Sequence, residues 1–194
     1  MDTQIMSVHS TAISWTAPII PCESLAGIKL GTSDSDLKTL LSQYLIDGNE
    51  LKYQFEDSPA LRLSAYGLDD EGNGGYKFSL FDSDLINTVK KSRPALSISM
   101  RGNKVTFLKV YDFSFADDAA QGFIYKGVLP GNIGLGDSVS DLVPLTDLEI
   151  DESDEFFYTD PAFGEVEITG LGVPLEDEPD QPITAICVIP GKKL

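Results

Sequence analysis

The chain has 194 residues, 42% of them hydrophobic, and its 31 acidic and 14 basic side chains give it a formal net charge of −17. This composition excludes a wholly disordered chain, and no apolar run approaches the roughly 20 residues that a membrane-spanning helix needs. The length suits one large domain or two small packed lobes. The negative field repels nucleic acid and anionic membranes and attracts a basic partner.

The first residues and the two cysteines indicate the compartment. Met1-Asp2-Thr3-Gln4 has neither the basic residues nor the apolar stretch of a secretory signal, so we expect a cytoplasmic protein. Cys22 and Cys187 lie in apolar stretches of sequence. This favours two buried thiols in a reducing environment, and a disulfide between them stays open as the alternative.

The chain divides into three predicted parts that together form one compact domain. Residues 1–22 are an N-terminal segment with a first strand at 12–17, because apolar and polar residues alternate there. Residues 23–111 form a first lobe with an extra hairpin. Residues 112–194 form a second, strongly acidic lobe.

An internal repeat organises the two lobes. Ile28–Leu37 and Ile133–Leu142 are identical at seven of ten positions, at a constant offset of 105 residues. Each copy has a glycine turn and then a serine three residues before an aspartate, a pattern that opens helices. A generic turn that simply occurs twice is the alternative explanation. Further partners at the same offset alternate as in half-buried strands, namely Leu61 with Val166 and Leu63 with Ile168.

The predicted fold class is therefore α+β, with two pseudo-symmetric copies of a glycine turn–helix–antiparallel-strand unit. It is strand-rich, and its second helix is short because Pro144 falls in the second turn. In the first lobe an apolar stripe from Leu37 to Leu45 predicts a helix of about three turns, ended by Asp47-Gly48-Asn49. A short helix is also expected between Asp82 and Lys91. The expected strands are 51–56, 60–66, 76–81, 95–100, 104–111, 155–159, 165–170 and 183–189, and the second copy opens at 123–129.

No group of residues in the sequence announces a reaction. His9 is the sole histidine, so a Ser/His/Asp or Cys/His nucleophile system and a zinc site both lack partners. The loop from Asp69 to Gly74 resembles the start of an EF-hand loop, but Leu80 stands where the bidentate glutamate belongs, which favours a plain turn. We expect no cofactor, no metal and no catalytic residue. A hydrolase that uses paired carboxylates is the less favoured alternative.

Acidic charge is concentrated in the second lobe. Residues 1–111 hold 13 acids and 11 bases, whereas residues 112–194 hold 18 acids and 3 bases. Acidic runs are common on solvated surfaces, and aromatic residues are common in cores. Here an acidic run precedes three aromatic residues, and at interfaces charge speeds association while buried aromatics supply affinity. The candidate partner-binding residues are Asp147, Glu149, Asp151, Glu152, Asp154, Glu155, Phe156, Phe157, Tyr158 and Asp160.

The repeated Ile-x-Leu-Gly-x-Ser-x-Ser-Asp-Leu element, followed by alternating strands, resembles the turn and helix of bacterial immunity proteins. Those proteins neutralise secreted toxins of polymorphic or type VI secretion systems. The resemblance implies tight one-to-one binding to a cognate toxin without catalysis, and it implies no particular interface residues. The acidic second lobe would then dock a basic face of its toxin, for example of a nuclease whose site accepts phosphates.

The same order of turn, helix and strands is also similar to proteinaceous enzyme inhibitors and to some envelope-assembly modules. The main alternative is therefore a chaperone or adaptor that holds a basic effector before its secretion. Such a protein would bind an unfolded or signal segment, and it would use exposed apolar surface more than a fixed charged face.

Overall fold

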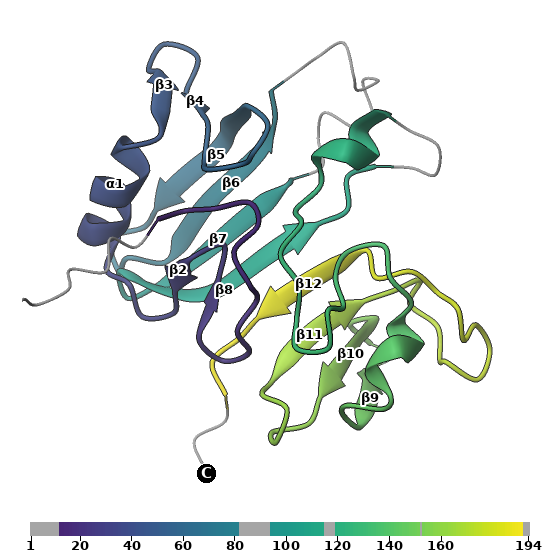
Figure 1. Ribbon diagram of the computed structural model, residues 1–194. Helices are drawn as coiled ribbons and strands as arrows, with labels where there is room; N and C mark the ends of the chain where they lie inside the picture. Colours follow the sequence, from purple (N-terminus) through teal and green to yellow (C-terminus); the bar gives the residue numbers. More distant parts are fainter. Residues whose placement is uncertain (1–11, 82–93, 115–118, 152, 192–194) are drawn as a thin grey trace, which may run out of the picture.

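The computed structural model describes residues 12–81, 94–114, 119–151 and 153–191. Figure 1 shows the strands and the helical elements that these residues form. In chain order the elements are β1 Ser24–Leu25, β2 Ile28–Lys29, α1 Asp34–Ser42, β3 Leu45–Asp47, β4 Lys52–Tyr53, β5 Leu61–Leu68, β6 Gly74–Leu80, β7 Leu96–Arg101, β8 Lys104–Tyr111, the 3₁₀ turns η2 Ala119–Phe123 and η3 Val139–Leu142, β9 Leu148–Asp151, β10 Phe156–Thr159, β11 Val166–Thr169 and β12 Ala185–Val188.

Ten strands form one antiparallel sheet, in the order β3-β4-β5-β6-β7-β8-β12-β11-β10-β9, and β1 pairs with β2 separately. The strands that follow α1 (β3 to β6) run inward from one edge, and those that follow η3 (β9 to β12) run inward from the other. The β7–β8 hairpin lies between the two sets, and β8 pairs with β12, so the sheet is continuous from the first half of the chain to the second.

The predicted α+β class, with a helix in each repeat, is wrong. The described residues are mostly β, with α1 as their one α-helix. In both copies the capping serine works as the sequence predicts, because Ser33 accepts the amide of Asp36 and Ser138 accepts that of Ser140. The second copy nevertheless makes only the four-residue turn η3. Pro144 has no amide to donate to a further helical turn, so the chain leaves the helix there.

Other predicted elements also differ from the structure. The predicted strand at 12–17 is a coil with one bridge, between Ser14 and Glu56. The first helix ends at Ser42, and Leu45, placed at the end of its apolar stripe, instead begins β3 opposite Tyr53. The helix predicted between Asp82 and Lys91 lies outside the described residues.

The core lies on one face of the sheet, here called the inner face. Alternation places Val166 and Ile168 of β11, both fully buried, on this face with Ile186 of β12. The N-terminal coil packs on the same face, since the Trp15 ring stacks on Phe55 at 6.5 Å and Phe55 packs against Phe78 of β6 at 5.4 Å. The register places Phe78 on the face that carries Ile186. In Figure 1 this coil and η3 lie on the same side of the sheet, and the opposite, outer face carries the alternate residues of each strand.

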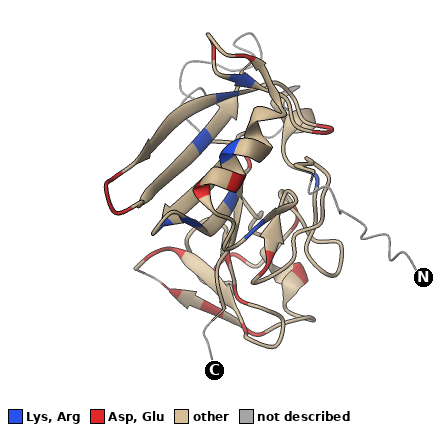
Figure 2. Cartoon of the chain, turned by 90° about the vertical axis from the view of Figure 1, so that its left-hand side faces the viewer, with Lys and Arg blue, Asp and Glu red and all other residues tan. Residues whose placement is uncertain are grey.

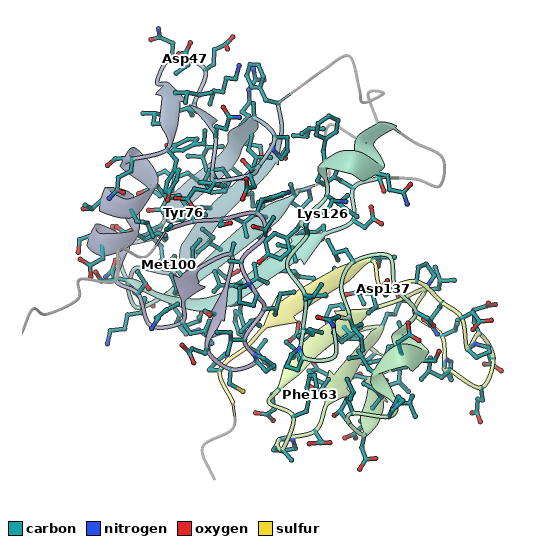
Figure 3. All side chains as sticks on the ribbon, in the orientation of Figure 1. Asp47, Tyr76, Met100, Lys126, Asp137 and Phe163 are labelled. Carbon is teal, nitrogen blue, oxygen red and sulfur yellow. The ribbon has the colours of Figure 1, made fainter. Side chains whose placement is uncertain are left out.

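A polar contact fastens α1 to the sheet. Tyr76 of β6, labelled in Figure 3, donates its hydroxyl to the Asp34 carboxylate at 2.5 Å, and Lys38 lies 2.7 Å from the other oxygen. Burial of Asp34 works against its charge, but the hydrogen bonds from Lys38 and Tyr76 outweigh it and hold its pKa below the usual range. Burial, followed by the bond to Asp34, raises the pKa of Tyr76.

Two expectations about the whole chain can be compared with the described residues. Cys22 and Cys187 are free thiols, Cys187 buried and Cys22 only half-buried, so the predicted burial holds for Cys187. In the ranges that the structure describes, no helix has the length and apolar character to cross a membrane.

Candidate functional site

The outer face of the second half of the sheet is hollowed into a groove of about 810 Å³. Its walls come from β9, β10, the loop that follows β10, and the chain just after β12, and we call it the acidic groove. Neither lysine nor arginine is among the described residues that line it. Its lining carboxylates are Asp147, Glu149, Asp151, Asp160 and Glu165, with Tyr158, Leu148, Ile150, Ser153, Thr159, Pro161, Ile189 and Pro190 between them.

Strand register explains why these side chains share a surface. Glu149 of β9 lies opposite Tyr158 of β10, and Tyr158 lies opposite Glu167 of β11. Opposite residues of antiparallel strands project from the same face, with Cβ atoms about 4.5–5.5 Å apart. The row continues through Cys187 of β12 to Lys109 of β8.

Five of the ten residues predicted from the sequence line this groove, namely Asp147, Glu149, Asp151, Tyr158 and Asp160. Asp154 and Glu155 lie in the turn between β9 and β10, and Glu152 is outside the described residues. Phe157 is 2% exposed and points into the core, as expected because alternation along the strand places it on the face opposite to Phe156 and Tyr158. Phe156 and Tyr158 are half-buried on the outer face.

Asp160 holds the groove wall together. One carboxylate oxygen accepts the amides of Ala162 (2.6 Å) and Phe163 (2.9 Å), and Figure 3 labels Phe163. The other accepts the Thr146 hydroxyl and the Asp147 amide at 2.9 and 3.0 Å. These hydrogen bonds, the one from Phe163 first, lower the pKa of Asp160 to about 2. Asp160 therefore has a structural role, because both of its carboxylate oxygens already accept hydrogen bonds within the chain.

Asp151 has a similar structural part at the β9–β10 turn. One of its oxygens accepts the hydroxyl of Ser153 at 2.6 Å and the amides of Ser153 and Asp154 at 3.0 and 3.4 Å. The bond from the Ser153 hydroxyl is the main reason that the pKa of Asp151 lies below its usual value. In contrast, Asp147 and Glu149 are exposed, and no ion pair within the described chain uses their carboxylates.

Beside Tyr158 the outer face carries ionisable side chains that were not predicted from the sequence as part of a site. Glu167 is half-buried, and burial raises the pKa of its carboxyl against the opposing effect of Lys109. Burial also raises the pKa of the Cys187 thiol to about 12. Lys109 lies with its Nζ 4.2 Å from the centre of the Phe156 ring. The strand parity of 165–169 would have placed Glu167 on this face, but only the register shows its neighbours.

A second acidic segment, 174–180, is held by a buried glutamine. Gln181 is fully buried, its Oε1 accepts the Leu171 amide at 2.8 Å, and its Nε2 donates to the carbonyls of Val173 and Glu178 at 2.9 and 3.0 Å. The segment is therefore an ordered loop rather than a loose tail. In Figure 2 blue Lys and Arg segments lie in the upper and middle parts of the view together with red ones, and the lower part carries red segments.

Metal and family comparisons add no further assignment. In the described ranges no three His, Cys, Asp or Glu side chains are grouped so that they could hold a metal ion. The segment from Asp69 to Gly74 connects β5 and β6, and Asp69 accepts the amides of Glu71 and Asn73.

The chain matches no protein-family model, and comparison with the curated proteins and with the solved structures likewise finds no match.

Proposed function

We propose that this protein is a non-catalytic immunity protein that binds a basic bacterial toxin through the acidic groove. The observation that carries the proposal is the groove itself, which is lined by the carboxylates of Asp147 and Glu149 and by Tyr158 without a described lysine or arginine. The repeated motif at Ile28–Leu37 and Ile133–Leu142 supports it through its resemblance to immunity proteins.

Charge favours a basic partner for physical reasons. Residues 112–194 hold 18 acids and 3 bases, so this half of the molecule attracts cationic proteins and raises the rate of productive encounter. Affinity would come mainly from side chains that become buried at the centre of the contact, and Tyr158 and Phe156 are the half-buried aromatics there. A nuclease suits this role because a site that accepts phosphates is itself positively charged.

The test is neutralisation by coexpression, followed by binding of groove variants. Coexpression should restore growth to cells that a basic partner otherwise kills, without any chemical change in that partner. The variant with Asp147→Asn and Glu149→Gln should associate at least about tenfold more slowly at low salt. These carboxylates make no described hydrogen bond, so the fold should be unchanged.

The matched control removes the same charge elsewhere. Glu176 and Asp177 are exposed on the loop 174–180, so Glu176→Gln with Asp177→Asn should change the rate much less than the groove variant. Equal effects of both variants would show that only net charge matters, and the groove would lose its role. Restored growth without a complex would point to catalysis and contradict the proposal.

A further inference from the structure

We propose that Tyr158, Glu149 and Glu167 form a socket for one arginine side chain of the protein partner. The proposal rests on the proposed function, since it takes the partner to be a basic protein. It concerns one row of the outer face, which we call the tyrosine row, with Glu149 on one side of Tyr158 and Glu167 on the other.

The spacing of the tyrosine row fits a guanidinium. Neighbouring strands lie about 4.7–4.9 Å apart, so Glu149 and Glu167 stand about 10 Å apart on either side of the ring. A guanidinium is planar, stacks on an aromatic face, and has donors on both sides that carboxylates can accept. The half-buried Tyr158 ring borders the groove, whose volume of about 810 Å³ admits a side chain.

The same sheet face already pairs a cation with an aromatic ring. Lys109 of β8 places its Nζ 4.2 Å from the centre of the Phe156 ring, two residues from Tyr158 on β10. Lys109 thus lies over the neighbouring ring and makes no described ion pair with Glu167, although its charge lowers the pKa of Glu167. The Tyr158 ring has no described cation over it, although it is the ring that lies between two carboxylates.

The acidic surroundings of Glu167 favour the binding of a cation. Burial raises the pKa of Glu167, Lys109 and a hydrogen bond with Cys187 oppose the rise, and Asp154 adds to it. The pKa of Tyr158 is raised by burial first and then by the charges of Glu167, Asp151 and Asp154. A cation between these groups would relieve the repulsion and lower the pKa of Glu167.

The test uses the whole protein and a blocked Gly-Arg-Gly peptide, with a citrulline peptide of the same shape but no charge as the control. Amide signals of 147–151, 156–160 and 165–169 should shift with the arginine peptide and stay with the citrulline peptide. Saturation with the arginine peptide should also lower the carboxyl pKa of Glu167, followed by carbon NMR. Shifts located elsewhere, or equal shifts with citrulline, would overturn the socket.

Variants separate the ring from the charges. Tyr158→Phe keeps the aromatic face and should bind the arginine peptide within about twofold of the wild type, whereas Tyr158→Leu and Glu167→Gln should each weaken it at least about fivefold. Glu176→Gln is the control and should change nothing. Unchanged binding by Glu167→Gln would contradict the socket even if the Tyr158→Leu variant failed to fold.

The outcomes keep the socket apart from the proposed function. If the peptide leaves the tyrosine row unshifted while a basic toxin still binds in a groove-dependent way, the socket is wrong and the function stands. If the peptide binds as described but no toxin is neutralised, the socket stands and the immunity function is wrong.

Discussion

Replacing Tyr76 by phenylalanine tests how α1 is fastened to the sheet. The Tyr76 side chain is 3% exposed and donates to the Asp34 carboxylate at 2.5 Å. A hydrogen bond to a charged group contributes about 1.5–3 kcal/mol, so Tyr76→Phe should lower the free energy of unfolding by about that amount. Lys38→Met is the control, because the Lys38 side chain is 50% exposed and water screens its pair with Asp34.

The effect of Tyr76→Phe should depend on pH in a fixed direction. The pKa of Asp34 is lower in the folded protein than its ordinary value of 3.8, so its ionised form contributes stability above that value. This contribution is lost as the pH falls through the folded-state pKa. The loss caused by Tyr76→Phe should therefore be full at pH 7 and clearly smaller at pH 3.

Urea unfolding at both pH values measures the change, with an unchanged slope as the sign that the unfolded state is unaffected. The Lys38→Met variant should lose much less stability than Tyr76→Phe. A loss below about 0.5 kcal/mol at pH 7, or the same loss at pH 3, would refute the reasoning that this hydrogen bond to a carboxylate holds the helix.

Two further predictions concern the second half of the sheet. Phe157→Ala should lower the free energy of unfolding, measured in urea, by about 3–5 kcal/mol because the ring is 2% exposed. Phe156→Ala, on the outer face, should lower it by less than half as much. Similar losses for the two variants would contradict the assigned faces. Gln181→Leu should cost about 2 kcal/mol or more and speed amide hydrogen exchange in 171–180 but not in α1, because three backbone groups of the loop lose their partner in the buried Gln181 side chain. Protection unchanged from the wild type, or lost equally in the exposed control Gln121→Leu, would contradict the role of Gln181 in the loop.

Strands with clean alternation could be predicted from the sequence. The segments 104–111 and 95–100 flank a turn at Gly102 and Asn103, both of which have positive φ, and they are β8 and most of β7. The edge strands β3 and β9 were missed. Leu45 continues the apolar stripe of α1, and Leu148–Asp151 belongs to an acidic run, so only pairing with β4 and β10 makes these segments strands.

The short second element was predicted from Pro144, but the fold class was wrong because a capping serine predicts where a turn begins and not that an α-helix follows it. Ser138 caps η3 as Ser33 caps α1, yet Pro144 ends the second element after one turn. The second copy thus contributes a 3₁₀ turn in place of a helix, and the pairing of ten strands in one sheet makes the described residues mostly β.

The candidate site could be predicted in part. Charge density identified 147–160, but it could not separate the exposed Glu149 from Asp160, whose oxygens accept four hydrogen bonds within the fold. Glu167 lies on the next strand along the chain, and its position beside Tyr158 depends on the β10–β11 register. Lys109 comes from β8, which is distant in sequence, and only the strand order β8-β12-β11-β10 brings it to the same face.

Recovery of partners on a tagged copy from the cells that encode this protein tests the central claim most directly. We expect to recover one basic protein in equal amount, and expression of that protein alone should stop growth. Its binding should persist in low salt and should be weakened by Asp147→Asn with Glu149→Gln. Many weak partners that all leave in high salt, or a partner bound equally by the groove variant, would contradict the claim that the acidic groove neutralises a toxin.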